Sequence, residues 1–276
     1  MARQQLARVK PETSRSLTLE VLRTARVSPA FARVTLGGGD VEHFRPLGFD
    51  QWFRLFLPVS ADSLDHVPDR LDTFTYLRHL MTSSTSRPVI RSYTVRAYRP
   101  DGPSGPELDV DLVLHGSAED GTAGPAATWA STCRAGDHVA IIDEGILFVP
   151  PAGTTQVTLV ADETALPAVA GVLASLDADA VGTAVVEVPH ADDRQDLDAP
   201  VGVDVRWLVR GDDPRPPGSL ALDHVRATTT APTPTWYGWA AGESALATGA
   251  RRHWVSTGAS RDQITFCGYW KHRTRH

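Results

Sequence analysis

The feature that most constrains this chain is a change in the pattern of its apolar residues at Pro150-Pro151. Before the two prolines, short strand-like apolar stretches are separated by turn-forming residues, which is typical of an antiparallel barrel or sandwich. After them, buried-type strands alternate with segments of helical spacing, which predicts an α/β layer with a mostly parallel sheet. A length of 276 residues fits two domains of ordinary size. We therefore predict two domains, residues 1–150 and residues 151–276.

The individual elements follow from these two patterns. Strands of the first domain are expected at Leu17–Val21, Phe31–Leu36, Trp52–Leu57, Ser92–Tyr98, Leu108–Leu114 and Val139–Ile142. Strands of the second are expected at Val157–Ala161, Val185–Val188, Val205–Val209, Trp236–Ala240 and Gln263–Cys267, with helices over Leu166–Leu176 and Ala245–Trp254. Between strands, we expect a long excursion at Ser60–Pro88 with a short helix at Phe74–Met81, and a surface loop at Ala227–Thr235.

Composition excludes several classes of protein. A formal charge of −6 argues against wholesale nucleic-acid binding. Two cysteines are too few for a disulfide framework or an all-cysteine iron–sulfur cluster, and the histidines lack metal-ligand spacing. No apolar signal region or bilayer-spanning run is present, so we expect a cytoplasmic protein that does not enter the membrane. The basic residues between Arg251 and His276 either attract an anionic ligand or form a solvated tail.

One strand of the first domain carries side chains suited to a flat, anionic ligand. Strand alternation puts Arg91 and Tyr93 on one face and Ser92 and Thr94 on the other. An arginine offers a rigid donor fork for phosphate, and a tyrosine offers a flat surface for a ring. Taken alone, such a strand is more often an ordinary exposed barrel strand.

Two neighbouring segments add to this candidate site. In Leu108–His115 the leucines and Val110 share a core-facing side, which leaves Asp111, Val113 and His115 available to a ligand or to solvent. Gly124-Pro125 then leads into small residues, as at the start of a helix, where free backbone N–H groups can bind an anion. Many helices begin this way without binding anything.

The second domain offers two strand-to-helix junctions. Ala161–Pro167 follows a strand, with Thr164 as the expected N-cap and Pro167 in the first helical turn. Trp239–Ser244 repeats this layout, and the following helix is expected to end at Arg251-Arg252. Ligands of open α/β sheets bind at the carboxyl ends of strands, but the usual glycine-rich dinucleotide fingerprint is missing. Ser244 lacks the glycine of a nucleophile elbow.

The order of these motifs resembles the siderophore-interacting protein family, a branch of the ferredoxin–NADP reductase fold. The matching stretches are Arg91–Arg96, Asp111–Gly116 with Gly124–Ala130, Ala161–Ala168, Ala241–Ser244 with Arg251-Arg252, and Gly268-Tyr269-Trp270-Lys271. The resemblance implies an N-terminal Greek-key barrel that binds FAD and an α/β domain that binds NADH or NADPH. Electrons would pass through FAD to Fe(III) in a ferric siderophore, and iron would be released as Fe(II).

The resemblance also implies roles for individual residues. Arg91 would contact the flavin diphosphate, Tyr93 would pack on the isoalloxazine, and Thr94 would hydrogen-bond near the redox-active ring nitrogens. Ser92 would lie beside them. The other cofactor contacts would be Asp111, Val113, His115, Gly124, Pro125, Ala126, Ala127, Thr128 and Trp129 around FAD; Asp162, Glu163, Thr164 and Ala165 with Gly242, Glu243 and Ser244 at the nicotinamide end; and Tyr269 and Trp270 near the flavin's other face. Substrate contacts would come from Lys271, Arg273 and Arg252.

Three departures from the family pattern leave alternatives open. The link Ser117–Ala123 is stretched, Asp143-Glu144-Gly145 replaces a Gly-Pro turn, and Lys271 is the sole lysine of a short tail. Two carboxylates near FAD phosphates would repel them unless they point away. The alternatives are a flavoprotein reductase with another acceptor, or a non-catalytic module that has lost FAD. The pattern leaves open the choice of NADH or NADPH and the particular siderophore, and we expect a monomer.

Overall fold

The computed structural model describes residues 8–12, 14–72, 75, 77, 81, 83, 85–116, 123–229 and 231–272. The chain divides into two compact units. The barrel unit comprises Lys10–Leu47 and Gln51–Ile146, and the α/β unit comprises Met1–Val9, Gly48–Asp50 and Leu147–His276. The short segment Gly48–Asp50 therefore belongs to the α/β unit although it precedes a strand of the barrel. Each unit is described by itself below.

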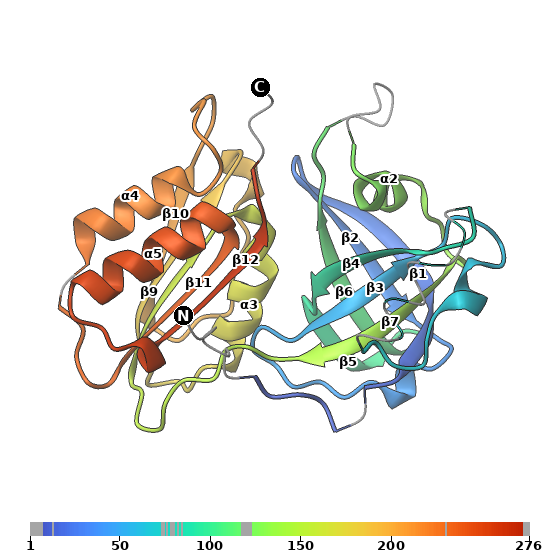
Figure 1. Cartoon of the computed structure of the whole chain (residues 1–276), viewed down its shortest axis with the longest axis horizontal. Coiled ribbons are helices and arrows are strands. Elements are labelled where there is room, and N and C mark those ends of the chain that lie inside the picture. Colours follow the sequence, from blue (N-terminus) through green and yellow to red (C-terminus); the bar gives the residue numbers. More distant parts are fainter. Residues whose placement is uncertain are drawn as a thin grey trace. The chain divides into compact units, whose positions relative to one another are not determined.

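The barrel unit is an antiparallel sheet with the strand order β4-β3-β7-β1-β2-β6-β5 (Figure 1). Its strands are β1 (Ser16–Ser28), β2 (Phe31–Gly37), β3 (Trp52–Leu57), β4 (Val89–Thr94), β5 (Ala97–Gly102), β6 (Gly105–Val113) and β7 (His138–Gly145). The helix α2 (Pro125–Thr132) and the 3₁₀ turns Val41–His43 and Ser63–His66 also belong to this unit. The expectation of an antiparallel barrel is confirmed.

The strand expected at Ser92–Tyr98 is in fact two strands. β4 pairs with β3, whereas β5 pairs with β6. At the junction, the amide of Val95 donates to the carbonyl of Gln51 at 2.8 Å, and the amide of Arg96 donates to that of Asp109 at 2.9 Å. The chain therefore changes partner strand within two residues. The apolar alternation continues across this bend, which is why sequence periodicity did not reveal it.

The core of the barrel is formed by alternate residues of its strands. Leu19, Leu36, Leu55 and Leu108 are all fully buried. The other face of β6 is buried too, because its carboxylates are covered by arginines from neighbouring strands. These contacts are Arg23 and Arg99 with Glu107, Arg99 with Asp109, and Arg33 and Arg96 with Asp111.

The α/β unit is a parallel sheet with the strand order β10-β9-β8-β11-β12 (Figure 1). Its strands are β8 (Gln156–Ala161), β9 (Val181–Val188), β10 (Gly202–Val209), β11 (Trp236–Glu243) and β12 (Ile264–Trp270), and its helices are α3 (Leu166–Ser175), α4 (Ser219–Thr228) and α5 (Ser244–Ser256). Short 3₁₀ turns lie at Glu163–Ala165, Ala191–Asp193 and Arg261–Gln263. Every residue of β11 is buried, as expected for a parallel strand covered by helices on both faces.

Helix α4 was not expected from the sequence. Ala221 and Val225 are its only buried residues, and Leu222 packs against the same core. Since α4 ends at Thr228, the loop expected at Ala227–Thr235 begins later than proposed. The helix expected at Phe74–Met81 lies largely outside the described residues. Within the described part of the chain, no helix is both long and apolar enough to cross a bilayer.

Candidate functional site

The strand β4, which contains Arg91-Ser92-Tyr93-Thr94, presents an exposed arginine side chain. Arg91 is exposed, and its Nη1 donates to the carbonyl of Ile90 at 2.8 Å. No described carboxylate pairs with it, unlike the arginines that cover β6. Tyr93 is half-buried against the barrel core, and burial raises the pKa of its phenol to about 12, so the ring stays neutral. Ser92 is exposed, whereas Thr94 is buried.

The two carboxylates at Asp143-Glu144 are engaged within the barrel unit. Asp143 accepts hydrogen bonds from Gln51 Nε2 and from the amide of Gly145, each at 2.8 Å. Burial raises the pKa of Asp143 above its usual range. Glu144 pairs with Arg54 at 3.4 Å, and Arg54 also donates to Ser92 Oγ at 2.9 Å. The repulsion that these carboxylates would exert on flavin phosphates is therefore partly neutralised.

Asp111 requires a correction. It was expected to be available to a ligand, but its side chain is fully buried. Arg33 donates to both carboxylate oxygens, at 2.6 and 2.8 Å, and Arg96 lies 3.5 Å away. Its strand alternation was predicted correctly, but arginines from β2 and from the β4–β5 junction cover it. Val113 is half-buried and His115 is exposed.

The helix start at α2 fits an anion. Gly124 is the N-cap in an extended conformation, no side chain caps the first turn, and Pro125 takes the first helical position as expected. The ring of His115 lies beside it, since a Cβ atom at Gly124 would be 3.5 Å from His115 Nε2. Ala126, Ala127 and Ala130 are buried, whereas Thr128 and Trp129 are half-buried. The structure therefore brings together two segments, β6 and α2, that the sequence analysis singled out separately.

These features of the barrel unit fit FAD. A diphosphate needs donors without competing carboxylates, and both the Arg91 guanidinium and the uncapped amides of α2 meet this requirement. A planar ring needs a flat apolar surface, which Tyr93 can offer. Ser117–Thr122, most of the stretched link, lies outside the described residues.

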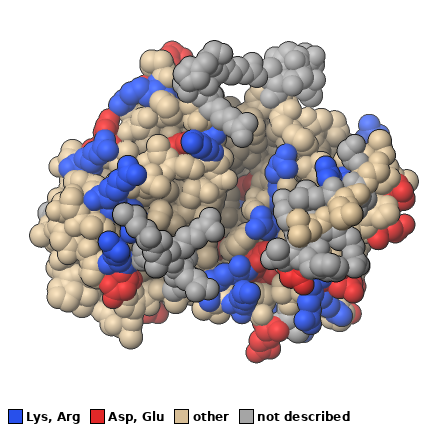
Figure 2. Space-filling view, viewed as in Figure 1, with Lys and Arg blue, Asp and Glu red and all other residues tan. Residues whose placement is uncertain are grey.

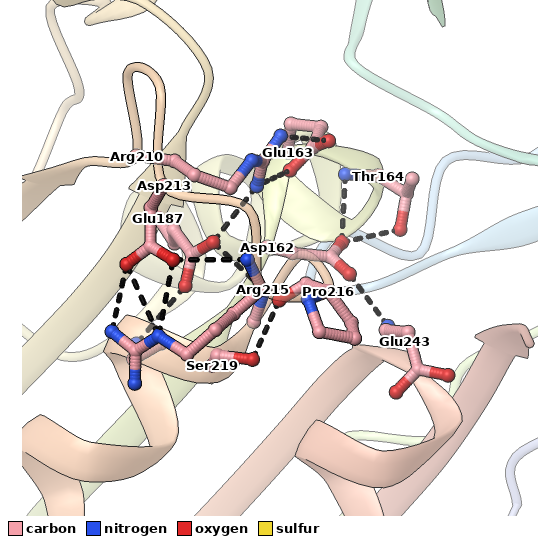
Figure 3. A network of polar contacts seen from close by, with 12 residues as sticks. Asp162, Glu163, Thr164, Glu187, Arg210, Asp213, Arg215, Pro216, Ser219 and Glu243 are labelled. Atoms are coloured by element: carbon pink, nitrogen blue, oxygen red, sulfur yellow. Dashed lines mark hydrogen bonds and ion pairs between the residues drawn. The ribbon is translucent and has the colours of Figure 1, made fainter. Parts of the chain in front are cut away.

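In the α/β unit, Asp162 organises the carboxyl ends of three strands. Its carboxylate is fully buried and accepts from the amide of Thr164 (2.9 Å) and the amide of Glu243 (2.6 Å), as Figure 3 shows. It also accepts from Thr164 Oγ1 (2.5 Å) and from Trp270 Nε1 (3.2 Å). Asp162 therefore caps the 3₁₀ turn Glu163–Ala165, and the N-cap position of α3 is Ala165, so Thr164 is not the N-cap that was expected. A nicotinamide could not reach Asp162 without displacing these donors.

The second junction is equally constrained. Gly242 has a φ of +124°, and a Cβ atom there would lie 2.5 Å from the carboxyl carbon of Asp162. Glu243 caps α5 by accepting from the amides of Ala245 and Leu246. Ser244 Oγ donates to the carbonyl of Trp270 at 2.6 Å. The predicted residues of both junctions thus lie together, but their polar groups are already hydrogen-bonded within the α/β unit.

Glu163 belongs to a buried charge network that sequence reasoning missed. Arg210, which follows β10, contacts Glu163 Oε1 and Glu187 Oε1, each at 2.8 Å (Figure 3). Glu187 is fully buried and also accepts from the amides of Gly218 and Ala221 at the start of α4. A charged residue inside an apolar strand, as Glu187 is in Val181–Val188, was the signal that could have indicated this network. Ala165 is fully buried and offers no side-chain contact to a ligand.

The residues expected at the flavin's other face and those expected at the substrate differ in their surroundings. Tyr269 and Lys271 are exposed and Trp270 is half-buried, while Arg273 lies outside the described residues. Helix α5 continues to Ser256, so Arg251 and Arg252 do not end it, contrary to expectation. Arg252 and Arg226 border a hollow of about 430 Å³ between α4 and α5, a region where Figure 2 shows several basic side chains. Among the described residues, no cluster of three or more His, Cys, Asp or Glu side chains could hold a metal ion.

An antiparallel barrel followed by a parallel α/β unit is the two-domain fold of the ferredoxin–NADP reductase-like proteins. Two family profiles match the chain. Residues 20–146 match the siderophore-interacting FAD-binding domain, and residues 154–273 match the siderophore-interacting protein domain. The chain therefore belongs to the siderophore-interacting protein family, and FAD is the cofactor that its barrel domain binds.

Similar proteins are known from several bacteria. A siderophore utilization protein from T. fusca, whose crystal structure is known, is 30% identical in sequence to this chain. The two structures match with a TM-score of 0.76, and 98% of each chain is covered. Ferric vibriobactin reductase ViuB of Vibrio cholerae is 29% identical over 92% of this chain and 88% of its own. The NADPH-dependent ferric-chelate reductase of Escherichia coli is 27% identical over 91% of each chain.

Proposed function

We propose that this protein is a cytoplasmic NAD(P)H-dependent reductase that uses FAD to reduce Fe(III) in a ferric siderophore and thereby releases Fe(II). The observation that carries the proposal is Arg91, an exposed guanidinium on the flavin-motif strand that has no described carboxylate partner. The names of ViuB and of the Escherichia coli relative support the ferric substrate. Both cysteines, Cys133 and Cys267, are thiols, which is consistent with a reducing compartment.

In this proposal the barrel residues bind and orient the cofactor. Arg91 holds the diphosphate, the α2 amides with His115 hold its other end, and Tyr93 supports the ring system. FAD supplies the redox chemistry, because it can accept two electrons from a nicotinamide and deliver them one at a time. The protein then needs no acid–base pair or nucleophile. Its contribution is to bind, to orient and to exclude water.

The α/β unit binds the nicotinamide donor in this proposal. Ligands of open parallel sheets bind beyond the carboxyl ends of the strands, where Thr164 and Ser244 are half-buried. We propose NADPH as the donor, since the Escherichia coli relative is named for it. Lys271 and Arg252, both exposed, are cations available to an anionic chelate or to the donor's phosphate.

Replacement of Arg91 tests the cofactor site. We expect Arg91→Ala to lose bound flavin by roughly ten-fold or more in affinity, because a charge-assisted phosphate contact is removed. The measurement is flavin absorbance per protein after purification and after reconstitution with FAD. Arg26→Ala is the matched control, since Arg26 is also an exposed barrel arginine whose guanidinium donates to a backbone carbonyl, at 2.7 Å. Unchanged flavin occupancy in Arg91→Ala would contradict the site.

The activity itself is tested by trapping Fe(II) while NADPH or NADH is oxidised in the presence of ferric chelates. Fe(II) formation that requires bound FAD supports the proposal. Oxidation of the nicotinamide without Fe(II) would indicate a flavoprotein reductase with another acceptor. A colourless protein that FAD cannot reconstitute would indicate a non-catalytic module.

A further inference from the structure

Helices α4 and α5 lie side by side along a line that large side chains do not fill. Leu222 and Arg226 line the space from α4. The lining residues of α5 recur every three or four positions, so they share one face of the helix; they are Ala245, Thr248, Gly249, Arg252, His253 and Ser256. Leu222 fits against Gly249, where a Cβ atom would lie 2.6 Å from Leu222 Cδ2. The other lining side chains of α5 are small or polar, so the hollow of about 430 Å³ remains beside this contact.

The lining of this hollow is basic. Arg226 and Arg252 carry positive charge, and none of the described residues that line the hollow is an aspartate or a glutamate. Figure 2 shows basic side chains gathered over the side of the molecule that carries α4 and α5, at the left of the view. An anion in the hollow would therefore meet attraction from both helices and no opposing carboxylate in the lining.

Neither arginine is committed to a buried partner. Arg252 is exposed, and no described carboxylate pairs with it. Arg226 lies 3.6 Å from Asp223, but that aspartate accepts a shorter hydrogen bond from Arg215, at 2.7 Å. Arg226 and Asp223 are 55% and 54% exposed, so water and ions screen their attraction. Both guanidinium groups can therefore bind an anion.

Contacts within the protein do not explain every polar group of the lining. The helix dipole favours cations in the last turn of a helix, which is where Arg226 lies in α4. Arg252 precedes the last turn of α5, which ends at Ser256, so the dipole does not account for it. The Nε2 atom of His253 is buried and has no hydrogen-bond partner in the described part of the chain. Such an atom is costly to leave unsatisfied.

The two arginines lie away from the strand ends at which a dinucleotide would bind. Helix α5 begins directly after β11, so its first residues are at the carboxyl ends of the parallel strands. Arg252 follows Ser244 by eight residues, about 12 Å along the helix axis. Helix α4 precedes β11, so Arg226 in its last turn lies towards the amino ends of the strands. A ligand held by both arginines would therefore be separate from the donor.

We propose that the hollow between α4 and α5 binds a small phosphorylated molecule, with Arg226 and Arg252 contacting its phosphate groups. A guanidinium offers a planar fork of donors that matches phosphate oxygens and stays charged. The volume of about 430 Å³ lies within the range of roughly 300–1,000 Å³ for small-molecule sites. It therefore has room for a phosphate and the group that carries it. The inference goes beyond the proposed function, since it assigns to Arg252 a ligand other than the donor or the ferric chelate.

The direct test titrates the FAD-loaded protein with inorganic pyrophosphate in a chloride buffer and follows the backbone amide signals by NMR. We expect saturable shifts at Arg226, Gly249 and Arg252. Shifts no larger than those caused by sodium chloride at the same ionic strength would overturn the proposal. Shifts centred instead on Thr164 and Ser244, at the carboxyl ends of the strands, would overturn it too.

Two arginine variants test the contacts. Arg226→Gln and Arg252→Gln should each weaken pyrophosphate binding roughly tenfold or more, because each removes a charge-assisted hydrogen bond. Arg206→Gln is the matched control, since Arg206 is a half-exposed arginine of the same unit that pairs with Asp204 at 2.6 Å. It should leave the affinity unchanged. Equal affinities in all three variants would contradict the proposal.

Thr248→Phe distinguishes a bound ligand from diffuse attraction to a basic surface. Thr248 lines the hollow, and its hydroxyl donates only to carbonyls of its own helix, so both arginines stay in place when it is replaced. The larger ring should fill the hollow and weaken pyrophosphate binding roughly tenfold or more. An unchanged affinity would show that the anion does not enter the hollow and would overturn the proposal.

The dissociation constant of NADP⁺ separates this site from the donor site. We expect Arg226→Gln to bind NADP⁺ as the unaltered protein does. A weaker affinity would place Arg226 in the donor site and would overturn the proposal of a separate one. Neither titration depends on turnover, so a protein that forms no Fe(II) would contradict the proposed function and leave this inference standing.

Discussion

Replacement of Arg210 by methionine removes the charge from a buried network and leaves the length of the side chain similar. Arg210 is 12% exposed, and its partners Glu163 and Glu187 are 8% and 0% exposed. The change would leave two buried carboxylates without their cation. Removal of one partner of a buried ion pair costs about 3–5 kcal/mol, because the remaining charge is uncompensated.

The same unit offers a matched control in Arg215. It also pairs with two carboxylates, Asp213 at 2.8 Å and Asp223 at 2.7 Å, but it is 47% exposed and Asp223 is 54% exposed. Water and ions screen such pairs, whose contribution is typically about 0–1 kcal/mol. Each of the variants Arg210→Met and Arg215→Met thus removes an arginine that pairs with two carboxylates. The difference between them is that Arg210 is buried and Arg215 is exposed.

Urea unfolding followed by tryptophan fluorescence is the assay, since Trp207, Trp236, Trp239, Trp254 and Trp270 all belong to the α/β unit. A loss of about 3–5 kcal/mol would lower the urea midpoint by about 1–3 M. Arg215→Met should lower it by less than about 1 M. Equal midpoints for the two variants would refute the argument that burial sets the cost.

Two further predictions concern backbone and charge. Gly242→Ala should lower the free energy of unfolding by about 2–4 kcal/mol, more than the control Gly258→Ala. Both glycines have positive φ, but only Gly242 faces a carboxyl group within 2.6 Å. Equal losses in urea unfolding would contradict the clash with Asp162. In the barrel, the hydrogen bond from Arg23 lowers the pKa of Glu107 to about 2. Its stabilising contribution is therefore complete above pH 4.5 and lost as the pH falls towards 2, and Glu107→Gln should flatten this part of the acid unfolding curve measured by circular dichroism. If Glu107→Gln left the acid unfolding curve unchanged, that result would count against the Arg23–Glu107 contact.

Local pattern was enough to predict most of the fold. Strand alternation and strand–helix alternation depend on residues that are near one another in sequence, so β3 was predicted with the bounds Trp52–Leu57 that the structure has. The break between β4 and β5 escaped prediction for the same reason, because alternation continues across a change of partner strand. The helix α4 was missed although Ala221, Leu222 and Val225 have helical spacing.

The candidate site could be predicted as a set of segments but not as a set of contacts. The structure brings His115 next to Gly124, and the junctions of Asp162 and Gly242 meet at the ends of parallel strands. Which side chains remain available to a ligand could not be predicted, because their partners are distant in sequence. Asp111 and Arg33 are separated by 78 residues.

The sequence by itself therefore determined the two-domain organisation and the family, and it proposed the segments that would face the cofactors, because periodicity and motifs can be recognised in the chain without its tertiary contacts. Only the tertiary structure decided which of the charged residues in those segments are available. Asp111, Asp162 and Glu163 are engaged within their own unit, whereas Arg91 has no described carboxylate partner. The physical reason is that burial makes a charge costly unless a partner satisfies it, and folding supplies that partner from a distant strand.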